Sequence, residues 1–194
     1  GESFDGDIFC KDAIDNGSIA VITDNPETLG RFILVKDTYD ALLKIASHHH
    51  KQINPRTIAI TGSNGKTIVK EWLNSCLEKA YNTCKSPKSY NSQIGVSLSI
   101  MGLKQSHEIG VFEAGMSQKG EMIRLKNIIQ PSIGIFTNIG QAHSENFESL
   151  KEKTKEKASL FSEVKKLIYC KDHKEVNEAA IELNSVKLCT WSSK

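Results

Sequence analysis

The most constraining feature of this chain is the segment Thr-Gly-Ser-Asn-Gly-Lys-Thr at residues 61–67. It follows the short apolar run 57–60 and precedes residues 67–80, whose pattern predicts a helix. A glycine-containing loop between a strand and a helix points backbone N–H groups toward a phosphate, and the helix N-terminus adds partial positive charge. Lys66 would meet the outer phosphates, and the hydroxyl of Thr67 would hold Mg²⁺. The sequence therefore predicts a site for a nucleoside triphosphate.

The loop departs from the general pattern G-x-x-x-x-G-K-[ST], which would need a glycine where this chain has Ile60. Its two glycines, Gly62 and Gly65, are three residues apart in the sequence. A plain turn between a strand and a helix is the alternative interpretation. We prefer the phosphate-binding one, because Gly-Lys-Thr between a strand and a helix rarely arises by accident.

Apolar segments alternate with amphipathic segments from residue 57 onward, which predicts an α/β fold with a largely parallel sheet and helices on both of its faces. Ligands of such sheets bind outside the carboxyl ends of the strands. Glu113 and Asn138 stand at the ends of predicted strands, and the phosphate loop and His143 come just after predicted strands, so we expect all of them at one edge of the sheet. The predicted strands are 57–61, 108–114, 132–138, 166–170 and 186–191, and the predicted helices are 67–80, 120–129 and 150–164.

The first part of the chain predicts a smaller α/β piece. Residues 19–22 and 32–35 are typical of short buried strands. Residues 37–48 predict a helix with Asp37 as its N-cap. We expect the three histidines at 48–50 at the exposed end of this helix, because adjacent helical residues point in different directions.

A polar, proline-bearing joint at residues 52–56 marks the expected domain boundary. With 194 residues, the chain is long enough for one large domain or two small ones. The boundary would separate a domain of residues 1–52 from a domain of residues 53–194, which holds the phosphate loop.

Composition argues against several classes of protein. The net charge of +2 is too small to favour binding to nucleic acid or to an anionic membrane. No apolar run approaches the roughly 20 residues that span a bilayer, and no basic-then-apolar signal peptide opens the chain. The five cysteines are irregularly spaced without C-x-x-C, which argues against a disulfide framework and a structural zinc site. We therefore expect a cytoplasmic protein that binds neither nucleic acid nor membrane.

Two residues that follow strands are candidate metal ligands. Glu113 ends an apolar strand, where burying a lone carboxylate is costly. Mg²⁺ would offset that cost, because it takes hard oxygen ligands; a helix cap or a lysine partner is the alternative. His143 lies beyond the following strand, where a second divalent ion or a phosphate would be within reach. A surface histidine is the alternative there.

Two other segments have more than one interpretation. The mixed charges of residues 151–157 are typical of an exposed helix face. Lys157 differs, because it opens the apolar run 158–161; a partly desolvated lysine there would have a lowered pKa and react with CO₂. The residues alone do not carry that proposal. Residues 89–95 are polar and loop-like, and they line a substrate cleft or form a connecting turn.

Four segments, in this order and at this spacing, resemble the Mur ligases of peptidoglycan synthesis. They are the loop at 61–67, the segment from Asn91 to Gly95, Phe-Glu-Ala-Gly at 112–115, and Thr-Asn-Ile-Gly-Gln-Ala-His at 137–143. The resemblance covers nearly the whole chain. It implies an ATP-dependent amide-bond ligase in peptidoglycan precursor synthesis, which adds D-Ala-D-Ala to UDP-N-acetylmuramoyl-tripeptide through an acyl phosphate.

The resemblance also implies roles for individual residues. Contacts to ATP are expected from Thr61, Gly62, Ser63, Asn64, Gly65, Lys66, Thr67, Asn91 and Asn138. Mg²⁺ is expected at Thr67, Glu113, His143 and Lys157. Lys157 matches the carbamylated lysine of the family. Catalysis is expected to depend on Lys66, His143 and Lys157.

In terms of this family, residues 1–52 would be part of an N-terminal UDP-sugar-binding domain, and residues 53–194 an ATP-binding central domain that is incomplete at its C-terminal end. The adenine and amino-acceptor contacts would lie beyond this chain, so we expect a fragment that is inactive by itself. Some ligases of this kind are fused to an alanine racemase, and whether the protein carries such a domain is a question that the sequence leaves open. Ser92 and Gln93 depart from the pair of asparagines usual in the family.

Three alternatives stay open. The first is a related ligase that adds an amino acid to another carboxylate, as in folylpolyglutamate synthesis or an earlier peptidoglycan step. The second is a nucleotide-binding module without activity of its own. The third is a P-loop kinase or GTPase, which normally shows a longer loop and an Asp-bearing metal motif, whereas the candidate metal carboxylate here is Glu113.

Overall fold

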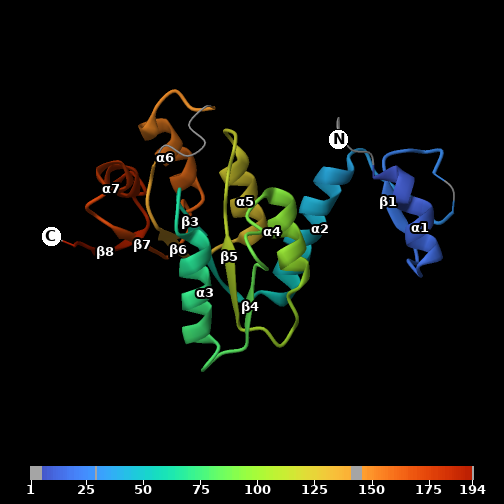
Figure 1. The fold of residues 1–194 in the computed structure, drawn as a ribbon, viewed down its shortest axis with the longest axis horizontal. Helices are drawn as coiled ribbons and strands as arrows, with labels where there is room; N and C mark the ends of the chain where they lie inside the picture. Colours follow the sequence, from blue (N-terminus) through green and yellow to red (C-terminus); the bar gives the residue numbers. More distant parts are fainter. Residues whose placement is uncertain (1–5, 29, 141–145, 194) are drawn as a thin grey trace. The chain divides into compact units, whose positions relative to one another are not determined.

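The structure is a computed structural model of the chain and describes residues 6–28, 30–140 and 146–193 (Figure 1). Most of it is an α/β fold with a six-stranded parallel sheet and helices on both faces, which confirms the predicted fold class. Within the described part of the chain, no helix is both long enough and apolar enough to cross a membrane. All five cysteines lie within the described ranges, and none of them forms a disulfide there.

The chain divides into two compact units, Gly1–Lys44 and Ile45–Lys194. The division falls inside helix α2 (Thr38–Ile53). This helix begins as the sequence predicts, because the N–H of Asp40 donates a 2.7 Å hydrogen bond to the side chain of Asp37. It continues five residues beyond position 48, so the compact units separate before the polar joint rather than at it.

The first unit contains a short 3₁₀ helix η1 (Asp7–Phe9), helix α1 (Cys10–Asp15) and a parallel pair of strands, β1 (Val21–Thr23) and β2 (Phe32–Leu34). All three residues of β2 are exposed, so the expectation of buried strands is wrong there. Among the described residues of this unit, the two strands and short helices are too few to cover both faces of the sheet, which explains why β2 is exposed.

In the second unit the strands follow the order β4-β5-β3-β6-β7-β8 and all neighbours run parallel. The central strand, β3, therefore lies between the strands whose carboxyl ends were expected to carry the functional residues. The bounds are β4 Thr83–Lys85, β5 Ile109–Glu113, β3 Arg56–Thr61, β6 Ile133–Phe136, β7 Lys166–Cys170 and β8 Lys187–Trp191.

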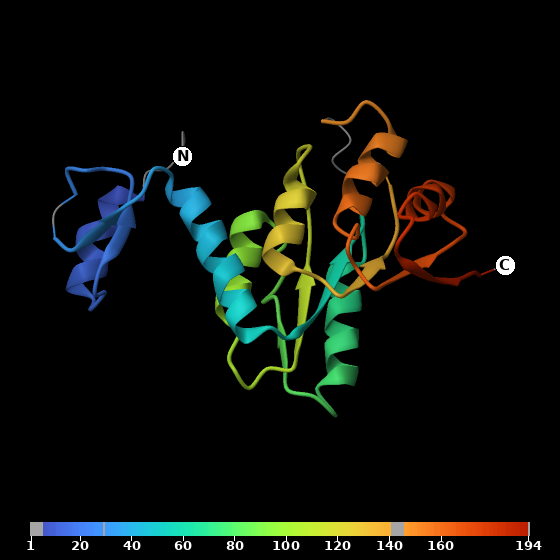
Figure 2. The ribbon, with the colours of Figure 1, turned by 180° about the vertical axis from the view of Figure 1, so that it is seen from behind.

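Helix α3 (Lys66–Leu77) covers one face of this sheet, and α4, α5 and α6 cover the other, as the two opposite views show (Figures 1 and 2). Side chains of β3 point alternately to the two faces of the sheet, so Ile58 and Ile60 lie on the same face. There they pack against Leu73 and Leu77 of α3. Helix α7 packs beside α6. The bounds of these helices are α4 Gln93–Met101, α5 Glu121–Ile129, α6 Leu150–Ser159 and α7 Lys174–Ile181.

Two helices end earlier than their patterns predict. Helix α3 ends at Leu77 rather than at residue 80, and α6 ends at Ser159 rather than at residue 164. After α6 the chain tightens into turns, with the N–H of Phe161 bonded to Ala158 O at 2.8 Å. These turns place the ring of Phe161 6.1 Å from that of Phe136, so a tertiary aromatic contact replaces the last predicted helical turn.

The expected exposure of the histidine run is wrong for His50, whose side chain is buried. Its Nε2 lies 2.8 Å from the hydroxyl of Thr57, at the start of β3. Burial lowers the pKa of His50 to about 4, so the ring is neutral at pH 7. His49 Nε2 in turn lies 3.0 Å from Leu103 O. Because α2 continues to Ile53, its last turn packs onto the protein instead of fraying into solvent.

Candidate functional site

The loop between β3 and α3 depends on two glycines in the left-handed region, Gly62 with φ 147° and Gly65 with φ 79°. A Cβ at Gly62 would lie 2.0 Å from the hydroxyl oxygen of Thr137, so only glycine fits there without a shift of the neighbouring loop. A Cβ at Gly65 would meet nothing within 4 Å. The second glycine is therefore required by the backbone conformation alone, where the chain turns into α3.

Asn138 comes two residues after β6, the strand next to β3, and holds this loop by two hydrogen bonds. Its backbone carbonyl accepts a 3.0 Å hydrogen bond from the N–H of Ser63, and its Oδ1 accepts a 2.9 Å bond from the N–H of Asn64. The hydroxyl of Thr137 donates to Asn64 O at 2.6 Å. Asn138 thus fixes the shape of the phosphate loop, and its predicted contact with a nucleotide stays a prediction.

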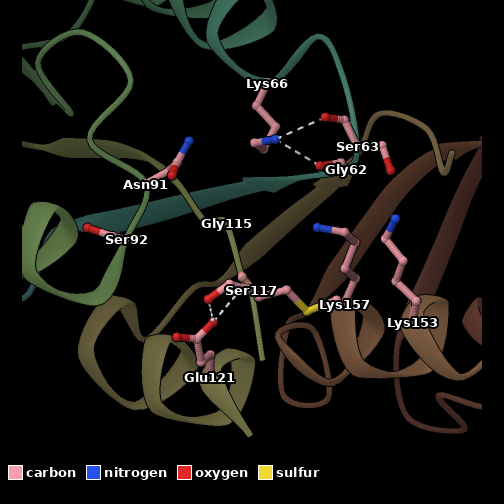
Figure 3. A pocket seen from close by; sticks show the side chains of 11 residues that line it. Gly62, Ser63, Lys66, Asn91, Ser92, Gly115, Ser117, Glu121, Lys153 and Lys157 are labelled. Carbon is pink, nitrogen blue, oxygen red and sulfur yellow. Dashed lines mark hydrogen bonds between the residues drawn. The ribbon is translucent and has the colours of Figure 1, made fainter. Parts of the chain in front are cut away.

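Lys66 is the first residue of α3, and its side chain folds back over the loop (Figure 3). The ammonium donates to Gly62 O at 2.9 Å and to Ser63 O at 3.3 Å. Desolvation lowers the pKa of Lys66, and the charge of Glu113 partly opposes that shift. The first N–H groups of an α-helix have no intrahelical partners, so this helix start presents donors and a positive charge together.

Glu113 ends β5 and is fully buried. Strand register pairs it with Ile60 of β3, two residues before the loop glycine Gly62. Its Oε2 accepts a 3.0 Å hydrogen bond from the hydroxyl of Thr67. Its Oε1 lies 2.9 Å from Lys70 Nζ and forms an ion pair with it. Among the described residues, no group makes a hydrogen bond to this oxygen. The carboxylate therefore has a lysine partner and also borders the phosphate loop.

A cavity of about 200 Å³ opens beside the loop (Figure 3). Lysines from α6 point toward the loop from the opposite side, and Asn91 and Ser92 lie on another wall. The lining residues are Gly62, Ser63, Lys66, Asn91, Ser92, Gly115, Met116, Ser117, Glu121, Lys153 and Lys157. Three of these residues are lysines and one is a glutamate, so the charged groups of the lining favour an anionic ligand.

Lys157 is 4% exposed and lines this cavity, so its side chain does not point into bulk solvent. Burial is the main cause that lowers its pKa to about 7, and the nearby charges of Lys66 and Lys153 act in the same direction. A substantial fraction of Lys157 is therefore a neutral amine at pH 7. Lys153, one helical turn earlier, is also buried, and its ammonium donates to Gly140 O at 2.6 Å.

The wall that carries Asn91 is positioned by the segment after β5. The N–H of Gly115 donates to Asn91 O at 2.8 Å, and a Cβ at Gly115 would lie 2.7 Å from Asn91 Oδ1. Glycine at 115 thus lets the asparagine approach the end of β5 closely. Across the cavity floor, Glu121 Oε2 accepts from the backbone N–H groups of Ser117 and Gln118 at 2.6 and 3.0 Å, which closes the turn before α5.

Among the site residues predicted from the sequence, His143 lies outside the described residues. Within the described ranges, no three His, Cys, Asp or Glu side chains gather into a metal-binding group. The structure does bring the phosphate loop, Glu113 and Asn138 to one edge of the sheet, with Lys157 and Asn91 on the walls of the adjoining cavity.

Sequence reasoning missed Lys70, Lys153 and Glu121. Lys70 had a recognisable signal, because it precedes Leu73 and Leu77 by three and seven residues and thus lies on the apolar stripe of α3. Lys153 lies four residues before Lys157, on the same helix face, which was interpreted as solvent-exposed. Glu121 occupies the first turn of α5, a common place for a carboxylate.

Comparison with known proteins gives a consistent set of matches. The profile of the Mur ligase middle domain matches residues 60–193. A Bacillus subtilis protein named UDP-N-acetylmuramoyl-tripeptide–D-alanyl-D-alanine ligase is 35% identical over 179 residues, which cover 89% of this chain and 39% of that protein. The chain thus spans about two fifths of the length of this curated relative.

Solved structures match over almost the entire chain. MurF from Acinetobacter baumannii superposes with a TM-score of 0.88 at 28% identity, covering 98% of this chain and 43% of that one. MurF ligase from Thermotoga maritima, solved in complex with ADP, gives a TM-score of 0.90 at 26% identity and covers 100% of this chain and 46% of that one.

Proposed function

The chain belongs to the Mur ligase middle domain family, and on that premise we propose that the protein carrying it is an ATP-dependent amide-bond ligase. Its proposed substrates are UDP-N-acetylmuramoyl-tripeptide and D-Ala-D-Ala, the two named for the Bacillus subtilis relative. The reaction is a step of peptidoglycan precursor synthesis. Cysteines that form no disulfide fit a reducing compartment, and we assign the reaction to the cytoplasm.

The contact between Thr67 and Glu113 is the observation that carries this proposal. It joins the start of the phosphate-loop helix to a buried carboxylate at the end of the neighbouring strand. Mg²⁺ takes oxygen ligands, and one or two carboxylates with substrate phosphates and water suffice. Glu113 Oε1 is buried and makes no hydrogen bond among the described residues, and the Thr67 hydroxyl is a second hard oxygen. This donor set fits Mg²⁺.

The phosphates of ATP are proposed to bind at the start of α3. The start of the helix presents backbone N–H groups there, and Asn138 keeps the loop in shape by accepting hydrogen bonds from the N–H groups of Ser63 and Asn64. Lys66 is poised to exchange its two loop carbonyls for phosphate oxygens. When bound, Mg²⁺ would neutralise phosphate charge. The protein's contribution to acyl phosphate formation and its capture by the amine is chiefly positioning and charge stabilisation.

Lys157 is proposed to carry a carbamate and, in that form, to be a metal ligand. A neutral amine is the form that reacts with CO₂, and the lowered pKa of about 7 provides it at neutral pH. Its place in the cavity wall beside Lys66 supports the assignment.

His143 keeps its proposed metal role. For the domains, we propose an ATP-binding central domain at 53–194 and part of a UDP-sugar-binding domain at 1–52.

The test is ADP release by the full-length protein with the tripeptide substrate and D-Ala-D-Ala. We expect turnover only when ATP, a divalent cation and both substrates are present. Turnover that requires a different acceptor or donor, such as glutamate with a folate, would establish a related ligase instead. Translation of the reading frame past Lys194 decides whether a racemase domain is fused to it.

Replacing Lys66 by Ala should abolish ADP release while the far-ultraviolet spectrum of the protein stays unchanged, because several kcal/mol of transition-state stabilisation depend on such a group. Lys79, an exposed residue just after α3, is the matched control, and Lys79→Ala should keep full activity. Unimpaired ADP release by Lys66→Ala with the authentic substrates contradicts the proposed role.

A further inference from the structure

Lys70 is a buried lysine that does not line the cavity, yet it contacts several elements that build it. Its side chain has no exposed surface. The ammonium donates hydrogen bonds to Ser86 O, at 2.8 Å, and to Lys88 O. It also lies 2.9 Å from Glu113 Oε1 and 3.1 Å from Glu71 Oε1. One ammonium thus joins α3, the segment that follows β4, and the end of β5.

We propose that Lys70 is a positioning residue that orients the Glu113 carboxylate for the divalent cation and sets the segment 86–92 against it. The inference rests on the proposed function, in which Glu113 is a metal ligand. A buried ammonium is tolerated only where charged and polar groups satisfy it. The two carbonyls and the Glu113 carboxylate provide that environment, and each is thereby tied to the same atom.

The orientation of Glu113 is fixed from two positions of α3 that are three residues apart and lie on the same side of the helix. Thr67 holds Oε2 by a hydrogen bond of 3.0 Å, and Lys70 lies on the side of Oε1. The backbone of Glu113 is held as well, because its N–H donates to the hydroxyl of Ser86 at 3.1 Å. Rotation of the carboxylate would break at least one of these contacts. Lys70 keeps the ion pair without adding a hydrogen bond to Oε1, which leaves that oxygen a lone pair for another ligand.

The same ammonium also acts on the cavity wall. Ser86 and Lys88 come shortly before Asn91 and Ser92, which line the cavity opposite the lysines of α6. Lys88 has φ 48°, a left-handed backbone that is unfavourable for a residue with a side chain. The bond from Lys70 to its carbonyl holds this turn in place. Lys70 therefore links metal-ligand geometry to the position of the cavity wall.

A purely structural ion pair is the competing explanation, and Lys85 provides the matched control. Its ammonium pairs with Glu71 Oε2 and so also joins β4 to α3, but it touches neither Glu113 nor the carbonyls of 86–88. Both side chains of that pair are more than a third exposed, so the pair contributes little. Lys85→Met removes a lysine between the same two elements without disturbing Glu113.

The experiment measures Mn²⁺ binding to the full-length protein in the presence of ADP, from the electron paramagnetic resonance signal of free Mn²⁺. ADP binding is measured separately in EDTA. Lys70→Met should weaken Mn²⁺ binding at least tenfold and change metal-free ADP binding less than threefold. Lys85→Met should change both less than twofold. Mn²⁺ affinity of Lys70→Met within twofold of the unsubstituted protein, or an equal loss in Lys85→Met, overturns the inference.

Glu113→Gln separates this inference from the proposed function. If Glu113→Gln leaves Mn²⁺ affinity unchanged, the proposed metal site itself is wrong. If it weakens binding, the double variant Lys70→Met/Glu113→Gln should bind Mn²⁺ no more weakly than Glu113→Gln alone, because both changes act on one ligand. Additive losses would mean that Lys70 acts elsewhere, and would overturn the inference.

Lys70→Arg covers the case in which Lys70→Met does not fold. Arginine keeps the buried positive charge, but its planar fork cannot reproduce the contacts of a single ammonium nitrogen. We expect its Mn²⁺ affinity to fall at least threefold, with circular dichroism unchanged. An affinity within twofold of the unsubstituted protein would show that the geometry of Lys70 is immaterial.

Discussion

The hydroxyl of Thr67 donates a 3.0 Å hydrogen bond to Glu113 Oε2, although the two residues are 46 positions apart in the sequence. Thr67 belongs to the first turn of α3 and Glu113 ends β5, so the bond connects the phosphate loop to the neighbouring strand end. Because the carboxylate is fully buried, it depends on such protein donors for stability. The same two residues are proposed ligands of Mg²⁺, so this contact affects both the stability of the chain and the geometry of the proposed metal site.

Replacing Thr67 by Val should therefore destabilise the isolated chain by about 1–3 kcal/mol, the usual effect of leaving a buried acceptor without its donor. Thr67→Ser keeps the hydroxyl and should stay within about 1 kcal/mol of the unsubstituted chain. Urea unfolding at pH 7.5 measures both. Equal stability of the valine and serine variants would show that the hydroxyl does not support Glu113.

Gly62→Ala should disrupt the phosphate loop. Its Cβ would lie 2.0 Å from the Thr137 hydroxyl and 3.0 Å from the backbone of Asn138, and its φ of 147° is one that side chains rarely adopt. We expect a loss of more than about 2 kcal/mol in unfolding free energy and no measurable ADP binding. Gly65→Ala, with open space around its Cβ, should cost only about 1–2 kcal/mol for the left-handed backbone.

The double variant Gly62→Ala/Thr137→Ala tests the cause of that disruption. Removing the threonine side chain removes the shortest contact, although the two contacts to Asn138 stay. Part of the lost stability should return. If the double variant is no more stable than the sum of the two single changes predicts, backbone strain rather than the clash is responsible.

Much of this site could be predicted because local patterns specify it. The glycines and lysine of residues 61–67 identify a strand–loop–helix unit, and the predicted strand 166–170 agrees in bounds with β7. Placing Glu113 beside the loop needed one further rule, that parallel strands end at a common edge. The membership of the chain in the Mur ligase middle domain family agrees with both.

Other features depend on contacts between distant segments, which no local pattern reveals. The apolar stripe of α3 indicates that Lys70 faces the core, but it does not reveal the partners of Lys70, which are Ser86, Lys88 and Glu113. His50 was expected in solvent, but the start of β3 covers it. Lys153 shares a charged segment with exposed neighbours and is nevertheless buried. For His50 and Lys153, burial is decided by tertiary packing rather than by sequence period.

Lys157 should make the stability of the chain depend on pH. Its folded pKa of about 7 lies below the ordinary lysine value of 10.5. The unfolded chain therefore binds more protons between these values, so stability rises as pH increases from about 7 to 10.5. Below pH 7 the full destabilisation applies. Lys157→Met should accordingly stabilise the chain at pH 6.5, by on the order of a few kcal/mol, and by progressively less at higher pH.

Lys151→Met is the control, because Lys151 is an exposed residue of the same helix. Unfolding is measured in CO₂-free buffer so that only the proton equilibrium contributes. Adding ¹³C-bicarbonate at pH 8 should then give a carbamate carbon signal that disappears in Lys157→Met but persists in Lys151→Met. A carbamate signal that survives Lys157→Met assigns the modification to another amine.

His50 should make the chain sensitive to acid. Its folded pKa of about 4 lies below the ordinary value of 6.5, because burial disfavours the charged ring. The unfolded chain binds the proton more readily in this window, so the stability of the neutral ring is present above pH 6.5 and is lost as pH falls toward 4. The expected loss is up to about 3 kcal/mol, from 1.36 kcal/mol per pKa unit.

His50→Gln cannot titrate, and its side-chain amide can still donate to the Thr57 hydroxyl, so the difference in unfolding free energy between pH 7.5 and pH 4.5 should shrink. His48→Gln, on the exposed side of the same helix, should leave that difference unchanged. If both variants lose stability in acid as steeply as the unsubstituted chain, carboxylates rather than His50 control the acid transition.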